Sequence, residues 1–342
     1  MSPGMALLNL PWEKWERIPY TSQNRQSAPT SQLNKTSCSM TTLLHWRLKI
    51  AFLAILLTAT SCTQAAFMAV NLPSQFESLS VKHDFGYGPD PSQKLDIYVP
   101  IDIEEKLLEV IVFLYGGRWT SGTKEDYRFI GATFARKGFV VVIADYRKYP
   151  AVRFPVFIED GAKALAWVAD HISEHHGNPE KIHIIGHSAG AHIGALLTAD
   201  SHYLAEEGKS RTSIIHDFVG LAGPYAFTPD EPDLEDMFGP PENYLNMQVT
   251  SFIDGTQPPM LLLYGDRDST VKYSNLQKLE QRITQQGGCV QSRVYRNVNH
   301  TDLLKALSWL NLQKVPVVED SIKFFLGCKQ QGNEEASSGG QR

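Results

Sequence analysis

The pentapeptide Gly186-His-Ser-Ala-Gly190 constrains the fold more than any other stretch of this sequence. It follows the apolar run 181–185 and precedes residues 191–197, which have the composition of a helix. A strand, a tight turn through a serine and then a helix is the context in which a G-x-S-x-G pattern forms a sharp elbow. The two glycines let the helix pack close to the strand. The segment therefore predicts an α/β fold that presents the hydroxyl of Ser188 at the edge of a sheet.

Length and charge limit what else the chain can be. With 342 residues, 42% of them hydrophobic, the sequence is long enough for one α/β domain of about 250–270 residues and an N-terminal extension. The net charge is −5 and no long basic run is present, so the sequence predicts no nucleic-acid partner.

The extension divides into two parts. Residues 1–39 are polar and without periodicity, which predicts disorder and an overlong gene start. Residues 40–62 have a basic segment, a short apolar run and small residues, in the order of a secretory or lipoprotein signal. We then expect a linker over 63–79, one α/β domain over 80–328 and a disordered tail over 329–342.

The four cysteines bear on location and cross-linking. Cys62 stands where a bacterial lipoprotein carries its lipid, which predicts a membrane anchor; cleavage near Ser61 or Ala65 with a soluble product is the alternative. Either way we expect an exported protein, periplasmic, membrane-anchored or secreted. Cys289 precedes a predicted strand and Cys328 ends the helix after it, so both lie at one edge of the sheet. An oxidising compartment would allow them to form a disulfide.

Strand and helix patterns alternate along the rest of the chain. This alternation predicts a mainly parallel central sheet with helices on both faces. The segment 223–257 is longer than a usual connection, and we expect it to form a small lid or pocket wall. Strands are expected at 81–85, 95–98, 109–114, 139–144, 182–185, 217–221, 259–264 and 290–295, and helices at 127–137, 156–175, 191–197, 275–286 and 319–325.

A serine at such an elbow needs a base, and the base needs an orienting acid. On this kind of sheet the chain order is serine, then acid, then histidine. His300 is the one histidine beyond His216, and it follows a predicted strand. Asp266 and Asp268 both follow the preceding strand. We assign Asp268 as the acid, because it lies deeper in the loop, and His300 as the base.

An oxyanion formed by attack of Ser188 needs at least two backbone N–H donors. One is expected from Ala189, at the start of the helix. The others are expected from Gly117 and Arg118, because two adjacent glycines let this loop approach a substrate. Three aromatic residues are expected to line the substrate pocket: Trp119, Tyr225 and Phe227.

These motifs together resemble the α/β-hydrolases of the esterase/lipase superfamily. The chain is most similar to the group of feruloyl-esterase-like carboxylesterases, kynurenine formamidase and isoprenylcysteine methylesterase. One departure is visible, since Tyr115 stands where the family has the histidine of a His-Gly-Gly motif, and this predicts a difference in the pocket or in the oxyanion loop. The matching stretches are 93–100, 116–122, 145–147, 186–192, 265–268 and 299–300, and the resemblance covers about residues 80–327.

The resemblance implies a serine carboxylic-ester hydrolase with an acyl-enzyme intermediate, acting on short-acyl or bulky esters, small or polymeric. Two alternatives stay open: an arylformamidase-type amidase with the same triad, and a non-catalytic binding protein on a hydrolase fold. No cofactor is implied, and oligomeric state leaves no mark on the sequence. His171-x-x-Glu-His175 matches a zinc pattern without an evident third ligand, so no metal is predicted. We interpret Asp145-Tyr-Arg147 and Asp160 as a polar network that braces the sheet.

Overall fold

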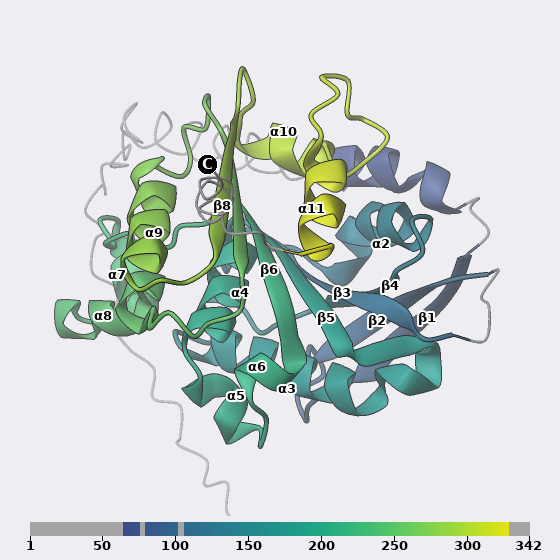
Figure 1. Ribbon diagram of the computed structural model, residues 1–342, viewed down its shortest axis with the longest axis horizontal. Helices are drawn as coiled ribbons and strands as arrows, with labels where there is room; N and C mark the ends of the chain where they lie inside the picture. Colours follow the sequence, from purple (N-terminus) through teal and green to yellow (C-terminus); the bar gives the residue numbers. More distant parts are fainter. Residues whose placement is uncertain (1–63, 76–78, 102–105, 328–342) are drawn as a thin grey trace, which may run out of the picture. The chain divides into compact units, whose positions relative to one another are not determined.

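Eight strands form one sheet, in the order β1-β2-β4-β3-β5-β6-β7-β8. The computed structural model describes residues 64–75, 79–101 and 106–327. Strands β1 and β2 form an antiparallel pair, β2 is antiparallel to β4, and every other neighbouring pair is parallel (Figure 1). The strands are β1 (Leu79–Gly86), β2 (Lys94–Pro100), β3 (Leu108–Leu114), β4 (Val140–Ala144), β5 (Gly177–His187), β6 (Ile215–Leu221), β7 (Met260–Gly265) and β8 (Val290–Tyr295).

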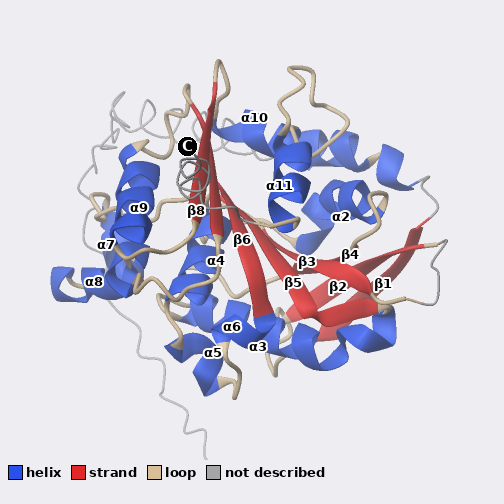
Figure 2. Cartoon of the chain, viewed as in Figure 1, coloured by secondary structure: helices blue, strands red, loops and turns tan. Residues whose placement is uncertain are grey.

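The central strands are apolar because helices cover both of their faces. All five residues of β4, Val-Val-Val-Ile-Ala, are buried, and so are all six of β7. Figure 2 shows α2 and α11 on one face of the sheet and α3 and α4 on the other. The longer helices are α2 (Arg128–Ala135), α3 (Val156–His171), α4 (Ala189–Ala199), α9 (Ser274–Gln285) and α11 (Val317–Phe325).

The predicted mainly parallel α/β sheet is confirmed, and its differences from the prediction lie at the ends of elements. Strand β5 begins at Gly177, five positions before its predicted start at residue 182. A helix was expected to begin at Tyr127, but a 3-10 turn, η2 (Lys124–Tyr127), precedes α2. Thr123 and Asp126 cap this turn reciprocally, which fixes an earlier start than apolar periodicity indicates. Helix α3 ends at His171, and residues 172–175, expected to continue it, form the 3-10 turn η3 (Ile172–His175).

Short helices that the sequence patterns did not reveal connect the later strands. They are too short for apolar residues to recur over several turns, which is why the sequence pattern did not indicate them. The predicted lid segment contains α7 (Pro232–Phe238), η4 (Pro241–Asn243), α8 (Tyr244–Met247) and η5 (Val249–Phe252). The others are α5 (His202–Glu206), α6 (Arg211–Ile214) and α10 (His300–Lys305).

Residues 64–71, inside the predicted linker, are helical and held to the domain. The side chain of Asn71 donates to the carbonyls of Glu125 and Asp126 and accepts a 2.8 Å bond from the backbone N–H of Phe129. The 3-10 turn η1 (Pro73–Gln75) follows. No helix among the described residues is long and apolar enough to cross a membrane.

Several predictions about the termini concern residues outside the described part of the chain. They include the predicted signal segment, lipidation at Cys62 and the C-terminal tail, and they stay predictions. Cys289 is disulfide-bonded. Because Cys328 lies outside the described residues, its pairing with Cys289 also stays a prediction.

Candidate active site

Ser188 forms the turn between β5 and α4 and has a backbone conformation that L-residues rarely adopt. Its φ is 54° and its ψ is −121°. The strain is held by the surrounding backbone, because the N–H of Ser188 donates to the carbonyl of Leu221 at 2.9 Å and its own carbonyl accepts from the N–H of His192 at 3.1 Å. Strained residues that the structure over-determines in this way concentrate at functional sites. The turn places Ser188 beyond the carboxyl end of a central strand.

Gly190 allows this turn to exist. A Cβ added at Gly190 would lie 2.0 Å from the carbonyl oxygen of Leu114, which is backbone of a central strand and has no room to move. We therefore expect Gly190→Ala to lower the free energy of unfolding by about 3 kcal/mol or more, measured by urea denaturation. Gly86→Ala is the matched control, because its added Cβ would meet nothing within 4 Å, and it should change stability by less than about 0.5 kcal/mol. Equal stability of the two variants would contradict this prediction.

Asp268 and His300 are brought together as the sequence predicted. The Nδ1 atom of His300 lies 2.7 Å from Oδ2 of Asp268. The other carboxylate oxygen, Oδ1, accepts from the backbone N–H groups of Thr270 and Val271, at 2.8 and 2.9 Å. Burial by itself would raise the pKa of Asp268, but the hydrogen bond from His300 and those from the backbone outweigh it and lower the pKa. The carboxylate is therefore fixed in position and stays ionised. Asp266 instead accepts from the backbone of the Asn297 turn.

Two contacts that the sequence analysis missed hold His300 in place. His300 is the first residue of α10, and Asn299 caps that helix by accepting from the N–H of Asp302 at 2.9 Å. On the other side, Nε2 of His187 lies 3.1 Å from the carbonyl oxygen of His300. His187 precedes Ser188, so this bond ties the histidine loop to the elbow. The spacing of Asn299 and Asp302 is a capping-box signal that sequence reading could have used.

The loop after β3 has an unusual run of backbone conformations. Gly117, Arg118 and Trp119 have φ values of 115°, 56° and 58°. The carbonyl of Gly117 accepts from the N–H and hydroxyl groups of both Thr120 and Ser121, at 3.0 to 3.1 Å. Because the C=O and N–H of a trans peptide point in opposite directions, these bonds turn the N–H of Arg118 away from the loop interior.

This loop lies directly beside the elbow. A Cβ built on Gly116 would be 3.0 Å from the Cβ of Ser188. Within the described part of the chain, no group accepts a hydrogen bond from the N–H of Gly117, Arg118 or Ala189. Unpaired N–H groups next to a serine are what an oxyanion hole requires, so the structure is compatible with all three predicted donors.

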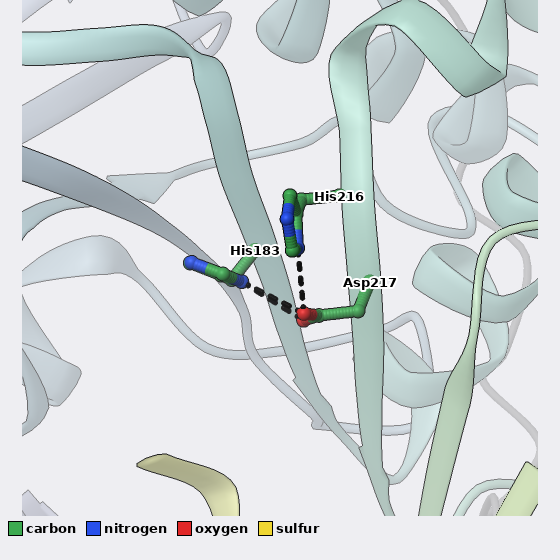
Figure 3. Close-up of side chains that lie close together, drawn as sticks. All are labelled: His183, His216 and Asp217. Atoms are coloured by element: carbon green, nitrogen blue, oxygen red, sulfur yellow. Dashed lines mark hydrogen bonds and ion pairs between the residues drawn. The ribbon is translucent and has the colours of Figure 1, made fainter. Parts of the chain in front are cut away.

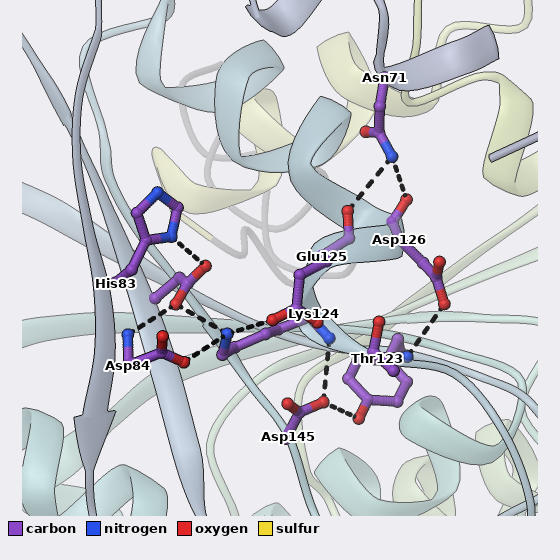
Figure 4. A network of polar contacts seen from close by, with 10 residues as sticks. Asn71, His83, Asp84, Thr123, Lys124, Glu125, Asp126 and Asp145 are labelled. Carbon is purple, nitrogen blue, oxygen red and sulfur yellow. Dashed lines mark hydrogen bonds and ion pairs between the residues drawn. The ribbon is translucent and has the colours of Figure 1, made fainter. Parts of the chain in front are cut away.

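Tyr115 does not enter the cavity but braces the oxyanion loop from behind. Its ring is buried and stacked between Tyr127 and Tyr146, with centroids 5.0 and 4.9 Å away. Its hydroxyl donates to the carboxylate of Asp145, which also accepts from the backbone N–H of Lys124 at 2.9 Å (Figure 4). The sequence predicted that Tyr115 would change either the pocket or the oxyanion loop. The structure favours the second effect, because Tyr115 supports the loop and does not form part of the pocket wall.

A buried lysine anchors the same region. Figure 4 shows the ammonium of Lys124 surrounded by carboxylates, including Asp84 at 3.0 Å. The carboxylate of Asp96 lies 3.1 Å away and that of Glu125 is also in contact. A buried charge needs such partners to offset the loss of water. The cluster ties β1 and β2 to the 3-10 turn that follows the oxyanion loop.

A cavity of about 680 Å³ opens at Ser188. Of the three predicted pocket aromatics, Trp119 and Phe227 line it and stack on each other with centroids 5.8 Å apart. Tyr225 does not line it. Its buried ring instead occupies the space beside Gly220 and Gly223, where a Cβ would come within 2.0 and 2.3 Å of the tyrosine. Because Gly220 and Gly223 have no side chains, the ring of Tyr225 can pack against the backbone there.

The opposite wall of the cavity is polar and comes from segments that the sequence did not assign to the site. The loop between β7 and α9 contributes Ser269, Thr270 and Lys272, and the start of α9 contributes Asn275 and Lys278. At the rim, Arg118 forms ion pairs with Glu231 and Asp233, at 2.8 and 2.9 Å. The predicted lid segment is thereby linked through α7 to the oxyanion loop.

His192 is buried under the aromatic wall and makes stability depend on pH. Burial lowers the pKa of His192 to about 4, whereas the unfolded chain binds the proton near about pH 6.5. The stability is complete above about pH 6.5 and is lost as the pH falls toward the folded pKa. Between pH 6.5 and 5 this amounts to about 2 kcal/mol.

We expect His192→Gln to remove this part of the acid sensitivity. Glutamine can keep the donor that now lies 2.7 Å from the carbonyl oxygen of Met247. Urea unfolding at several pH values would measure the difference. Leu312→Gln, at an exposed residue that does not titrate, should leave the pH slope unchanged. A wild-type slope in the His192 variant would contradict the lowered pKa of His192.

The remaining predicted polar residues lie outside the cavity. Arg147 binds Asp160 through Nη2 and Nε, at 2.7 and 2.9 Å, and Gln93 donates to the same buried carboxylate, which confirms a bracing network. His171 contacts the carbonyl of Trp167, and His175 lies 3.0 Å from the ammonium of Lys82. The imidazoles of the apparent zinc pattern thus have other partners.

The parallel sheet, the serine elbow after β5 and the Asp268–His300 pair after β7 and β8 define an α/β-hydrolase fold. Residues 95–283 match the model of the BD-FAE family, and the chain belongs to this family. It is 28% identical over 253 residues to an isoprenylcysteine alpha-carbonyl methylesterase of Arabidopsis thaliana, a match that covers 67% of this chain and 58% of that relative. Esterase LipC of Mycobacterium tuberculosis (strain ATCC 25618 / H37Rv) is 29% identical over 216 residues, covering 58% of this chain and 53% of the relative. The chain thus spans little more than half of these relatives.

Solved esterase structures share the fold. Esterase B from Lactobacillus rhamnosis, in a tributyrin phosphonate complex, superposes with a TM-score of 0.64 at 20% identity, covering 80% of this chain and 94% of that one. Esterase 2 of Thermogutta terrifontis, phosphoramylated by tabun, has a TM-score of 0.61 at 23% identity and covers 72% and 94%.

Proposed function

We propose that this protein hydrolyses carboxylic esters through a covalent acyl-enzyme on Ser188. The observation that carries the proposal is the hydrogen-bonded His300–Asp268 couple, tied by His187 to a serine in a strained elbow. The esterase names of the relatives support the same reaction class. A strained serine, a histidine oriented by a carboxylate and unpaired N–H groups are the parts that acyl transfer needs.

In the first step the Oγ atom of Ser188 attacks the ester carbonyl carbon and its proton passes to Nε2 of His300. Asp268 stabilises the resulting imidazolium, and the N–H groups of Gly117, Arg118 and Ala189 bind the oxyanion. The C–O bond to the alcohol then breaks, and the alcohol leaves with the proton from His300. Water, deprotonated by His300, repeats the attack on the acyl-enzyme and releases the acid and Ser188.

The cavity supports short-acyl or bulky esters as substrates. Its volume of about 680 Å³ lies within the range of small-molecule sites. One wall is aromatic, at Trp119 and Phe227, and suits a compact apolar group. The other wall carries hydroxyl, amide and ammonium groups and suits a polar portion of the substrate.

A fluorophosphonate probe followed by peptide mapping tests the mechanism. We expect modification of Ser188 in the wild type and none at that peptide in His300→Ala, whose serine lacks its base. Labelling of other serines alone would favour a binding protein on a hydrolase fold. A panel of p-nitrophenyl esters of increasing acyl length, feruloyl esters, a soluble polyester and N-formylkynurenine then tests substrate class. Preference for N-formylkynurenine over every ester would replace the esterase with an amidase.

A further inference from the structure

Two histidines and an aspartate meet where the amino end of β6 pairs with the middle of β5, away from the Ser188 turn that follows the carboxyl end of β5. His183 on β5 and Asp217 on β6 are register partners. Ser188 lies five positions after His183, which corresponds to about 16 Å along an extended strand. Figure 3 shows the imidazoles of His183 and His216 both directed at the carboxylate of Asp217. This cluster takes no part in the proposed ester hydrolysis.

A bulge in β6 creates the cluster. Ile182 pairs with Ile215, but the next residue of β5, His183, pairs with Asp217, so His216 is an extra residue. In a regular strand, the side chains of His216 and Asp217 would point to opposite faces of the sheet. The bulge instead lets Nδ1 of His216 reach Oδ2 of Asp217 at 3.0 Å. Bulges that re-aim a side chain in this way are typical of functional positions.

The three side chains present a matched set of ligand atoms. Nδ1 of His183 lies 2.9 and 3.0 Å from the two oxygens of Asp217. The candidate atoms of all three residues lie within 4.8 Å of one another. Ligand atoms around a tetrahedral zinc ion with bonds of about 2.0 Å are about 3.3 Å apart. Side-chain shifts of a few tenths of an ångström would therefore open the cluster enough to hold such an ion.

Glu109 on β3 supplies the outer partner that a ligating histidine requires. Its Oε2 atom lies 3.3 Å from Nε2 of His183, on the side of the ring opposite Asp217. Metal-bound histidines almost always donate their second ring N–H to a carboxylate or carbonyl, which fixes the tautomer. With its proton on Nε2, His183 has a free Nδ1 lone pair facing Asp217 and His216.

The cluster is buried at His183 and Asp217 and open to solvent at His216. The side chains of His183 and Asp217 are 1% and 4% exposed, and that of His216 is 42% exposed. Phe325 of α11 stacks on the ring of His183, with centroids 4.1 Å apart. Solvent therefore reaches the cluster from the side of His216, where an ion can enter and water can supply a fourth ligand.

We propose that His183, His216 and Asp217 bind a zinc ion, or a divalent ion of similar preference, as a structural site between β5 and β6. Two imidazoles and one carboxylate suit zinc and cobalt better than magnesium or calcium, which prefer oxygen ligands. The alternative is a His183 imidazolium held between the carboxylates of Glu109 and Asp217 without a metal. The metal site needs His216 as a ligand, whereas the metal-free ion pair does not.

Titration of the metal-free full chain, without a histidine tag, with Co²⁺ separates these alternatives. We expect one Co²⁺ per chain with the intense visible absorption of tetrahedral cobalt, displaced by Zn²⁺, and a raised Tm in excess Zn²⁺. His216→Ala removes an exposed ligand with little risk to folding and should weaken binding by more than the roughly 10- to 100-fold cost of losing an outer partner. Glu109→Gln should fall within that roughly 10- to 100-fold range.

His202→Ala is the matched control, because His202 is an exposed histidine 2.8 Å from the buried carboxylate of Asp200. It should bind Co²⁺ like the wild type. Binding unchanged in His216→Ala, or no tetrahedral cobalt spectrum from the wild type, would overturn the proposal. Either result would leave the proposed ester hydrolysis untouched, since Ser188 labelling is read out separately.

Discussion

Ser188→Ala is expected to lower kcat for ester hydrolysis by on the order of 10⁶-fold, the loss that removing a triad serine causes in subtilisin. The alanine has no nucleophile, so no acyl-enzyme forms. Folding should be unaffected, because the turn is held by backbone bonds to Leu221 and His192 that do not involve the hydroxyl. The measurement is the initial rate on a p-nitrophenyl ester under saturating conditions, with the urea midpoint as a check on folding.

Ser269→Ala is the matched control for this experiment. Ser269 lines the same cavity but lies in the loop between β7 and α9, not in an elbow. Its loss should change kcat by no more than a few-fold, through substrate contacts. Comparable rates for Ser188→Ala and wild type would exclude Ser188 as the nucleophile.

Asp268→Asn is expected to lower kcat by about 10⁴-fold while leaving the position of the side chain almost unchanged. The asparagine carbonyl can keep the two bonds from the N–H groups of Thr270 and Val271. Its NH₂ group then faces Nδ1 of His300 and donates to it. The histidine is held with its proton on Nε2, so it cannot accept the proton of Ser188.

The loss of kcat caused by Asp268→Asn should be the same throughout the neutral pH range, because the wild-type Asp268 carboxylate stays ionised there. The folded pKa of Asp268 is lowered, so its contribution to stability is present above the unfolded pKa of about 3.9 and is lost only as the pH falls through the folded value. Asp266→Asn is the control, because Asp266 supports only the Asn297 turn, and its kcat should stay within a few-fold of wild type. A loss equal in both variants would place the acid elsewhere.

Local sequence was enough to predict the serine, the acid and the base and their order along the chain. The elbow could be recognised because strand, turn and helix are contiguous, and Asp268 and His300 because each follows a strand whose carboxyl end meets the same sheet edge. The structure brings the latter two within 2.7 Å. Boundaries were less accurate where caps decide them, as at Thr123 before η2.

The contacts that support this chemistry depend on residues distant in sequence. His187 is bonded to the carbonyl of His300, 113 positions away, and Arg118 pairs with Asp233 of α7. Tyr225 could not be placed from sequence, because the two glycines that make room for its ring are special only in three dimensions. Tyr115 was visible as a departure, yet only its stacking between two tyrosines showed that it supports the loop.

The sequence by itself determined the parallel α/β architecture, the serine elbow and the chain order of acid and base, because these follow from periodicity and from motifs a few residues long. Tertiary structure alone decided the shape and polarity of the cavity, the brace behind the oxyanion loop and the bulge that joins His216 to Asp217. The physical reason is that strand register and packing bring distant residues together, and neither is specified by any local segment.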